Sequence, residues 1–278
     1  MDQGATLTRF ALFGSPVKHS LSPRIHQLFA AQAGISIEYD AIEVSEGFLS
    51  REVQKLADNG GKGCNITLPL KNHAFHLANG SSERAELAQA ANTLTFKTRT
   101  QWTAENTDGP GLIRDLTKNL GLKLSGSRIC VVGAGGASAG ILYDLLQHQP
   151  AELCLFNRTA ERAVTLAKRF SSIGKIEASG LEAMSTAEPF ELVINATSAG
   201  HQREQLAVSP ELFSAGACCY DLSYGVAHKT LKAWCKENEI HCYDGLGMLV
   251  EQAAESFRIW NGFMPKTAPV RELLSSDA

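Results

Sequence analysis

The chain has 278 residues, of which 44% are hydrophobic and 20% are charged, and its formal net charge at neutral pH is −3. This balance is typical of an ordinary globular protein and excludes the disordered and collagen-like classes, and the length fits one large domain or two modest ones, of which we expect two. Lysine and arginine are scattered without a basic run or an interleaved aromatic stripe, so neither nucleic acid nor an anionic membrane is an expected partner.

The cysteine pattern indicates a reducing compartment. The seven cysteines are an odd number, and no CxxC spacing occurs; they are Cys64, Cys130, Cys154, Cys218, Cys219, Cys235 and Cys242. This pattern favours reduced, buried thiols over a disulfide framework or a zinc site. The first residues, "MDQGATLTRFALFG", contain no long apolar run, so we expect no secretory signal and no transmembrane segment, and a cytoplasmic protein.

The first third of the chain has a βαβ rhythm. Alternation and short apolar runs predict strands over Arg9–Phe13, Glu38–Val44 and Gly63–Ile66, with helical periodicity between them. The stretch "ANTLTFKTRTQWTAEN" follows and predicts an antiparallel pair of strands that closes the first sheet. The first domain is therefore expected to be α/β with a mixed sheet and to end near Asn106.

A second α/β unit follows, entered through a predicted helix in "GPGLIRDLTKNLG". "SRICVVGAGGASAGILYDLLQ" predicts a strand, a glycine turn and a helix, and further strands are predicted over Glu152–Phe156, Glu191–Asn195 and Ala217–Asp221. After Gly245 the amphipathic stretch "LGMLVEQAAESFRIWNG" predicts a long helix that crosses back to the first domain. The predicted domains are residues 1–106 with 246–278, and a Rossmann-like domain over residues 107–245.

Polar stretches follow several predicted strands of the first domain. They are "GSPVKHSLSPRIHQ" with Ser20 and Ser22, "GCNITLPLK" with Thr67 and Lys71, "AANT" with Asn92, and "ENTDGPG" with Asp108. Ligands of open α/β sheets bind outside the carboxyl ends of strands. Hydroxyls, amides, one lysine and one aspartate form a set that can hold a small hydroxylated acid and move a proton.

Each of these residues also has a purely structural interpretation. Ser22 before Pro23 is a good helix N-cap, Asp108 before Gly109 is another, and Lys71 taken alone is a surface lysine. Four histidines fall in the first domain without a supporting carboxylate spacing, so no metal site is expected; they are His19, His26, His73 and His76.

The glycine turn of the second unit indicates a dinucleotide. Gly133 and Gly135 directly follow a buried strand and open a helix, where backbone amides can approach a pyrophosphate. Ser138 replaces the third glycine of the usual pattern, and a tight turn without a ligand is the alternative. The next strand ends in Asn157, Arg158 and Thr159 without an acidic residue, and Arg162 follows, which favours NADP over NAD. A solvated helix start is the alternative.

These motifs together resemble the shikimate dehydrogenases, a family that reduces 3-dehydroshikimate with NADPH in aromatic amino-acid (chorismate) biosynthesis. The resemblance spans nearly the whole chain and implies that Lys71 and Asp108 are the catalytic pair. It implies substrate binding by Ser20, Ser22, Thr67, Asn92, Tyr224 of "DLSYG" and Gln252 of the last long helix. The chain departs from the family's pattern at His201, where methionine is common, and lacks the proline often found shortly after Tyr224.

For the cofactor, the resemblance of "GAGGAS", "NRTAERA", "NATSAG" and "GLGMLVEQ" implies a larger set of residues. The implied NADP-binding residues are Gly133, Ala134, Gly135, Gly136, Ala137, Asn157, Arg158, Thr159, Arg162, Thr197, Gly245 and Met248. The family includes monomers and homodimers, and the sequence leaves these open.

The expected reaction transfers a hydride between the nicotinamide and a secondary alcohol carbon, while Lys71 and Asp108 handle the hydroxyl proton. Which of the two carries the proton stays open. A quinate or dual quinate/shikimate dehydrogenase that uses NAD is the enzymatic alternative, and a non-catalytic binding module is the alternative from another class. Arg158 argues against the first, and the presence of both Lys71 and Asp108 argues against the second.

Overall fold

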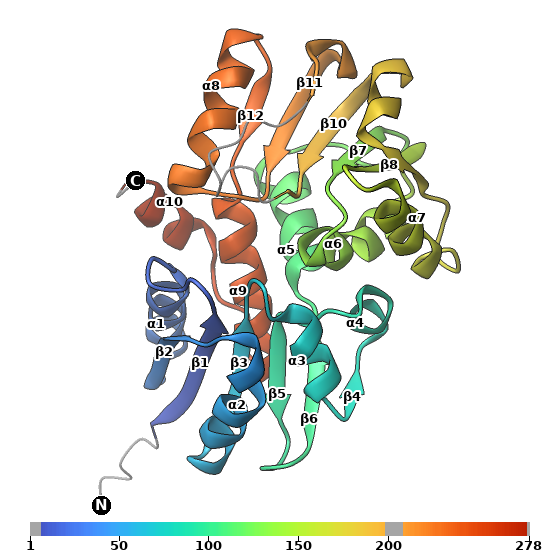
Figure 1. Cartoon of the computed structure of the whole chain (residues 1–278). Helices are drawn as coiled ribbons and strands as arrows, with labels where there is room; N and C mark the ends of the chain where they lie inside the picture. The colour runs from blue at the N-terminus through green and yellow to red at the C-terminus, as the bar shows by residue number, and fades with distance from the viewer. Residues whose placement is uncertain (1–6, 198–207, 277–278) are drawn as a thin grey trace, which may run out of the picture. The chain divides into compact units, whose positions relative to one another are not determined.

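The computed structural model describes residues 7–197 and 208–276 (Figure 1). The chain divides into two compact units, of which one lies within residues 1–111 and 249–277 and the other within residues 112–248. The C-terminal segment therefore completes the unit that the N-terminal segment begins.

The first unit contains a six-stranded mixed sheet with the order β2-β1-β3-β5-β6-β4. Its strands are β1 (Thr8–Gly14), β2 (Ile37–Glu43), β3 (Gly61–Ile66), β4 (Gly80–Ser81), β5 (Thr93–Phe96) and β6 (Trp102–Glu105). β1 pairs in parallel with β2 and β3, whereas β5 pairs antiparallel with β3 and β6. The predicted mixed sheet is confirmed. β4 was not predicted, because two residues carry no periodic signal.

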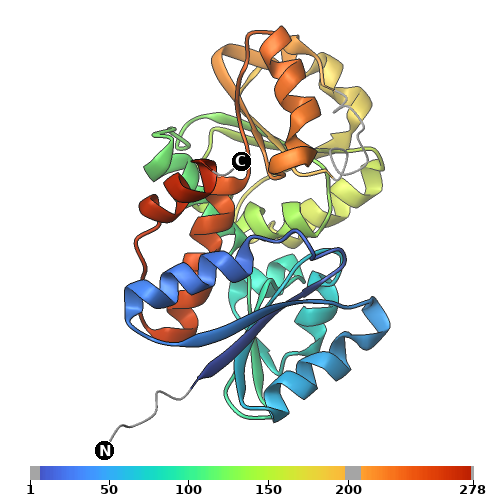
Figure 2. The same ribbon diagram turned by 90° about the vertical axis from the view of Figure 1, so that its left-hand side faces the viewer.

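β1 is buried on both faces, which explains its unbroken apolar run. Phe10 and Leu12 pack with Tyr39 on one face, while Ala11 and Phe13 belong to the core on the other. Helices α1 (Ser22–Ala33) and α9 (Leu246–Asn261) cover the first of these faces, and α2 (Leu49–Asp58) and α3 (Lys71–Leu77) cover the second (Figures 1 and 2).

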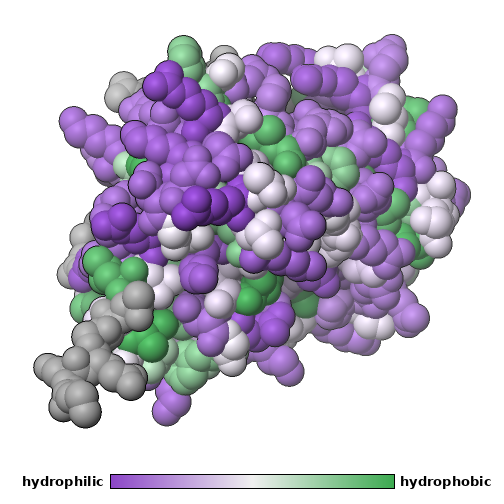
Figure 3. Space-filling model, turned by 90° about the horizontal axis from the view of Figure 1, so that it is seen from below, coloured by the Kyte–Doolittle hydropathy of each residue, from purple (hydrophilic) through white to green (hydrophobic). Residues whose placement is uncertain are grey.

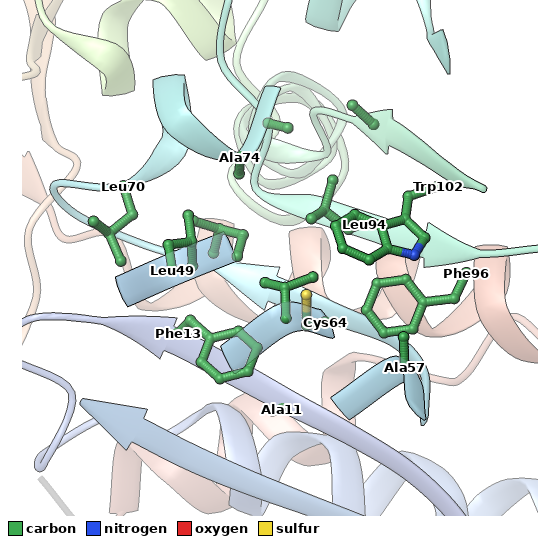
Figure 4. Packing of buried hydrophobic residues seen from close by; sticks show 14 of the residues in the cluster. Ala11, Phe13, Leu49, Ala57, Cys64, Leu70, Ala74, Leu94, Phe96 and Trp102 are labelled. Carbon is green, nitrogen blue, oxygen red and sulfur yellow. The ribbon is translucent and has the colours of Figure 1, made fainter. Parts of the chain in front are cut away.

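The core between the sheet and helices α2 and α3 is drawn in Figure 4. Leu49 of α2 and Leu70, just before α3, point toward Phe13 of β1, and the rings of Phe96 and Trp102 lie 5.4 Å apart at the other end of the cluster. This core holds α3 against the sheet, and with it Lys71, the first residue of α3.

The last long helix packs on the first unit, as predicted. The indole of Trp260 in α9 stacks on Phe10 at 4.6 Å and donates a hydrogen bond to the carbonyl of Leu94 at 3.1 Å. Phe257, one turn earlier, packs edge-on against Phe29 of α1. A shorter helix, α10 (Ala268–Ser276), follows, and α4 (Glu83–Ala88) precedes β5.

The second unit contains a parallel sheet with the order β12-β11-β10-β7-β8-β9. Its strands are β7 (Arg128–Val132), β8 (Glu152–Asn157), β9 (Glu177–Gly180), β10 (Phe190–Asn195), β11 (Phe213–Asp221) and β12 (His241–Tyr243). Numbered within the unit, this is the order 3-2-1-4-5-6 of doubly wound dinucleotide-binding sheets. β7 and β10 are neighbours at the position where the strand order reverses.

The helices of this unit are α6 (Gly136–Gln147), α7 (Ala160–Arg169) and α8 (Lys229–Glu237), with short 3-10 turns η3 (Leu181–Thr186), η5 (Pro210–Leu212) and η6 (Gly225–His228). The helix predicted before the glycine turn is α5 (Asp108–Arg114), which continues as the π-helical segment η2 (Asp115–Asn119). The predicted Rossmann-like architecture is confirmed.

Two strands of the second unit were not predicted, and they are the two edges of its sheet. β9 reads "EASG" and β12 reads "HCY", so neither contains an apolar run. Edge strands contact one neighbour and are less buried, so their sequences are under less pressure to be hydrophobic. Both join the sheet through backbone pairing with a stronger strand.

One face of the molecule is drawn in Figure 3. On the face drawn in Figure 3, hydrophilic residues predominate and hydrophobic ones form small separate groups. Across residues 7–197 and 208–276, every helix is too short or too polar to traverse a lipid bilayer.

Candidate active site

The sheet of the first unit brings four loops to one edge. β1 and β3 are parallel with Phe13 opposite Ile66, so the loops that follow them leave from the same edge. β5 runs the other way and begins at this edge with Thr93, which pairs with Glu105 at the end of β6. The candidate residues that follow β1, β3 and β6 and precede β5 are therefore gathered by strand direction alone.

Lys71 and Asp108 form an ion pair at this edge. The Nζ of Lys71 lies 2.5 Å from Oδ2 of Asp108, and the two side chains are 13% and 7% exposed. Lys71 begins α3 and Asp108 begins α5, so both stand at the first turn of a helix. Lys71 is therefore an enclosed, paired lysine instead of the surface lysine of the structural interpretation.

Asn92 holds the other oxygen of the aspartate. Its Nδ2 lies 2.9 Å from Oδ1 of Asp108, 2.9 Å from Oγ1 of Thr107 and 3.1 Å from Oε1 of Gln252. Its Oδ1 accepts hydrogen bonds from the backbone N–H of Thr107 and the hydroxyl of Thr93. Asn92 is buried, so this network fixes the amide in one orientation.

Helix α9 supplies two members of the same network. Gln252 approaches Asn92, as described, and donates from Nε2 to the carbonyl of Leu249. Ser256, one turn further on, lies within hydrogen-bond distance of Thr93 at 2.8 Å and of Thr107 at 3.1 Å, and accepts from Asn65 at 3.0 Å. Ser256 was not singled out from the sequence, although its spacing of four residues from Gln252 places both on one face of a helix.

Ser20 lies in the loop after β1 and Ser22 begins α1, and their hydroxyls are 3.2 Å apart. Ser22 falls inside the first turn of α1 and makes no side-chain cap, since Leu21 holds the cap position. The N-cap interpretation of Ser22 is therefore wrong. Thr67 follows β3, is half-buried, and donates its backbone N–H to the carbonyl of Phe13.

Two histidines of the first unit make packing or surface contacts. His26 is fully buried and stacks on Tyr39 with ring centroids 4.3 Å apart. Burial lowers the pKa of His26 to about 3, and Asn65 beside the ring opposes this only in part. His73 lies 3.0 Å from Glu46 at the surface.

The glycine turn lies at the position where the strand order of the second unit reverses. Gly133 has φ +108°, and a Cβ there would lie 2.9 Å from the carbonyl oxygen of Ala196, just after β10. The hydroxyl of Ser138 donates to the carbonyl of Gly133 at 2.6 Å, which closes the turn from inside α6. A serine in place of the third glycine therefore stabilises this turn.

Gly135 and Gly136 have no such structural reason to be glycine. Neither has positive φ, and a Cβ on either would meet no protein atom within 4 Å. Gly135 caps α6 and Gly136 is its first residue, so the space beside them faces the helix N-terminus. Ala134 lies beside them and donates its N–H to Oδ1 of Asn157, and Ala137 follows in the first turn.

The end of β8 carries the two arginines. Asn157 links the loops after β7 and β8, because it also donates from Nδ2 to the carbonyl of Thr159. Thr159 caps α7, and Arg158 and Arg162 are exposed on either side of it. Within the described chain, neither guanidinium has an ion-pair partner.

The remaining candidates follow β10, β11 and β12. Thr197 donates its hydroxyl to Asn195 at 2.7 Å, and residues 198–207, which include the rest of "NATSAG" and His201, lie outside the described residues. Tyr224 is half-buried at the start of η6. Gly245 donates its N–H to the carbonyl of Ser223, and Met248 is buried in the first turn of α9.

Comparison with protein families matches three models along the chain. The descriptions are shikimate dehydrogenase substrate binding domain over residues 12–94, shikimate/quinate 5-dehydrogenase over residues 115–208, and shikimate 5′-dehydrogenase C-terminal domain over residues 245–274.

Curated relatives match over nearly the full length. Shikimate dehydrogenase (NADP(+)) of Marinobacter nauticus is 44% identical, covering 96% of this chain and 98% of its own. The protein of the same name from Methylococcus capsulatus is 43% identical, covering 97% and 96%.

Solved structures agree with this fold. An Ael1 enzyme from Pseudomonas putida superimposes with a TM-score of 0.88 at 40% identity, covering 96% of this chain and 98% of that one. Shikimate 5-dehydrogenase of Thermus thermophilus, solved with NADP(H) and shikimate, gives a TM-score of 0.81 at 28% identity, with 96% and 98% covered.

Proposed function

Because the chain belongs to the shikimate dehydrogenase family, we propose that it catalyses the reversible, NADPH-dependent reduction of 3-dehydroshikimate to shikimate, a step of aromatic amino-acid biosynthesis. It is an NADP-dependent oxidoreductase that acts on a CH–OH group. Residues 1–106 and 246–278 are assigned to substrate binding, and residues 107–245 to NADP binding.

The proposal rests mainly on the ion pair of Lys71 and Asp108. Oxidation of shikimate removes a hydride from the carbinol carbon and a proton from its hydroxyl, and reduction reverses both steps. Lys71 and Asp108 are joined at 2.5 Å and largely enclosed, so a proton accepted from the substrate hydroxyl can be held between them. Asn92 restricts Asp108 through Oδ1, which leaves Oδ2 for the lysine.

The remaining groups at this edge suit the rest of the substrate. Shikimate carries one carboxylate and three hydroxyls, and the hydroxyl pair of Ser20 and Ser22 is assigned to the carboxylate. Thr67, Asn92 and Gln252 are assigned to the ring hydroxyls, and Tyr224 is assigned as a further substrate contact. Each of these side chains offers a donor or an acceptor, as recognition of a polyol requires.

The second unit has features that fit NADP. Bound NADPH supplies the hydride. Gly135 and Gly136 leave space beside the N-terminus of α6, where backbone amides and the helix dipole favour a pyrophosphate. Arg158 and Arg162 flank the N-terminus of α7 and offer planar guanidiniums to the 2′-phosphate. Thr197 and Met248 are assigned to the nicotinamide side.

An absorbance assay tests the proposal directly. The purified protein is mixed with shikimate and NADP, and NADPH formation is followed over time. We expect shikimate-dependent NADPH formation, and reduction of 3-dehydroshikimate in the reverse direction. An absence of turnover in both directions, with a folded protein, would contradict the proposed function.

Substrate and cofactor preference are measured in the same assay. Quinate replaces shikimate in one series and NAD replaces NADP in another. We expect the highest kcat/KM with shikimate and NADP, because β8 ends in Asn157, followed by Arg158 and Thr159, and not in an acidic residue that would accept the ribose hydroxyls of NAD. Equal efficiency with NAD would refute the assignment of Arg158 and Arg162.

A further inference from the structure

A cluster of soft ligands, none of them assigned to substrate or cofactor, lies in the second unit. The sulfur atoms of Cys219, Cys235 and Cys242 all lie within 4.8 Å of one another. The imidazole of His228 approaches the same cluster, with Nε2 at 4.0 Å from the sulfur of Cys242. Cys235 and Cys219 are buried, and Cys242 is half-buried.

The fold brings this cluster together from four elements between residues 219 and 242, on which the donors stand at least seven positions apart. Cys219 of β11 and Cys242 of β12 are direct partners in neighbouring parallel strands. Cys235 comes from α8, the helix that connects these two strands, and His228 from η6, just before that helix. No CxxC spacing marks such a site, which is why the sequence argued against zinc.

The four donors have the composition of a structural zinc centre. Three thiolates and one imidazole are a common tetrahedral set for Zn²⁺. Around such an ion, with Zn–S of about 2.3 Å and Zn–N of about 2.0–2.1 Å, two sulfurs lie about 3.8 Å apart and a nitrogen about 3.6 Å from a sulfur. The sulfurs lie within 4.8 Å of one another and Nε2 of His228 lies 4.0 Å from the sulfur of Cys242, so side-chain rotations must draw the four donors together to hold one ion.

The second nitrogen of His228 is already oriented as metal-binding histidines require. Its Nδ1 lies 3.0 Å from Oδ2 of Asp221, whose carboxylate is buried. A carboxylate that holds one ring nitrogen fixes the tautomer and leaves the other nitrogen as the ligand. In this arrangement Nε2 approaches the thiol of Cys242.

The chemistry of the thiols is consistent with a cation. Buried thiolates are costly without a positive charge, and a bound divalent cation supplies that charge. β12 is an edge strand and Cys242 is partly exposed, so an ion can reach the cluster from solvent.

We propose that Cys219, Cys235, Cys242 and His228 form a binding site for a thiophilic divalent cation, Zn²⁺, distinct from the residues assigned to catalysis. The site ties α8 to the two strands at the edge of the sheet. Asp221 connects it to the cofactor side, because its Oδ1 accepts a hydrogen bond from Asn195, the residue that also binds Thr197.

Metal titration of the full-length reduced protein tests the site. The protein is treated with a chelator, transferred to metal-free buffer with a phosphine reductant, and titrated with Co²⁺ and then Zn²⁺. We expect thiolate-to-cobalt charge-transfer absorption that saturates at one ion per chain and is abolished by Zn²⁺. Zn²⁺ should also raise the melting temperature, because it binds the folded state.

Matched variants separate this site from adventitious binding. Cys235→Ser and Cys242→Ser should weaken Zn²⁺ binding at least about 100-fold, since even outer-shell changes cost about 10–100-fold. Cys218→Ser serves as the control, because its side chain leaves the same strand toward the opposite face and should retain full binding. Circular dichroism of the half-buried Cys242→Ser variant shows whether the fold is kept.

Two outcomes would overturn the proposal. One is a wild-type protein without charge-transfer absorption, or with the same absorption in Cys235→Ser. The other is a protein that binds no metal when reduced and loses two titratable thiols on mild oxidation. That result would identify the cysteines as a redox pair. Shikimate turnover is measured in parallel, and its presence or absence does not affect either result.

Discussion

Lys71 differs from an ordinary surface lysine in that its side chain is 13% exposed and its amine is held by one carboxylate. An enclosed ion pair contributes little to stability, because desolvation offsets much of the Coulomb attraction. Its position at an edge lined with hydroxyls and amides is more readily explained by proton transfer.

Replacing this lysine should therefore affect turnover more than binding. Lys71→Ala is expected to lower kcat by on the order of 100-fold or more with a small change in KM, since it removes the proposed acid/base group. Steady-state kinetics with shikimate and NADP measure this. Lys62→Ala, at an exposed position of β3, is the control and should keep the wild-type kcat. An unchanged kcat in Lys71→Ala would exclude the lysine from the chemistry.

His26 makes the first unit sensitive to acid. Its pKa is about 3 in the folded protein and about 6.5 when unfolded. Between these values the unfolded chain binds a proton that the folded chain does not, so stability falls as the pH falls through this window. This one residue contributes a slope of about 1.4 kcal/mol per pH unit. Tyr39, which stacks on the ring, stays neutral throughout because burial raises its pKa.

The variant His26→Phe keeps an aromatic ring in the stack but cannot titrate. Urea unfolding at pH 4, 5 and 6 should give a shallower pH dependence of the unfolding free energy than in the wild type. His19→Gln, at an exposed position, should keep the wild-type slope. Parallel slopes for His26→Phe and the wild type would show that the buried ring is not the source of acid sensitivity.

At the scale of elements, the turn between β7 and α6 contains glycines of two kinds. One is needed for the backbone conformation, and the other leaves space for a ligand. Gly133 is required by its own conformation and by Ala196, so Gly133→Ala should lower the melting temperature, at a cost of roughly 1–3 kcal/mol. Gly136→Ala meets no protein atom and stands in a helix, so it should keep or slightly raise the melting temperature while raising the KM for NADP. Thermal unfolding and cofactor kinetics are measured on both variants. If Gly136→Ala keeps the wild-type KM for NADP, the pyrophosphate does not bind beside Gly136.

The start of α7 is expected to set cofactor choice. Arg158→Ala should raise the KM for NADP by roughly 10–100-fold, the range given by losing one hydrogen-bonded charge contact of about 1.5–3 kcal/mol, and should leave the KM for NAD unchanged. Lys168→Ala, an exposed cation near the other end of the same helix, controls for net charge. Equal effects on both cofactors would argue against a 2′-phosphate contact.

The elements that could be predicted from the sequence are those whose burial leaves a pattern. β1 and β7 read as apolar runs because both of their faces are covered, and α9 shows an apolar face. β9 and β12 gain their structure from a neighbouring strand, so their own residues carry little signal. The cysteine cluster was missed for a related reason, because its members meet only after β11 and β12 have paired.

The candidate site was predictable where it depends on strand direction and not where it depends on packing. Polar residues after β1, β3 and β6 and before β5 must share an edge, so the meeting of Lys71, Asp108 and Asn92 follows from topology. Ser256 reaches the same network from a helix that is distant in sequence, and no local pattern distinguishes it from other buried helical serines.

For the whole molecule, the first unit depends on a segment from the other end of the chain. Ser256 hydrogen-bonds or closely approaches Asn65, Thr93 and Thr107, which are all buried. A fragment of residues 1–111 lacks these partners and should not unfold cooperatively in urea, whereas residues 107–248 should. Joining residues 1–111 directly to 249–278 through a short glycine-serine linker should restore cooperative unfolding. A cooperative transition in the isolated 1–111 fragment would contradict this dependence.

Because the first unit is formed by both ends of the chain, the two units are completed at different times during synthesis on the ribosome. The N-terminal sheet emerges first, but its buried amides and hydroxyls gain their last partners only after residues 112–248 have been synthesised. At about 5–20 residues per second, that interval is roughly 7 to 30 seconds. During it the inserted unit can complete its own fold, while the nascent sheet exposes the surface that α9 will cover. Chaperones that bind exposed apolar surface therefore have a defined period in which to act on this protein. This period ends when the C-terminal helices have been synthesised.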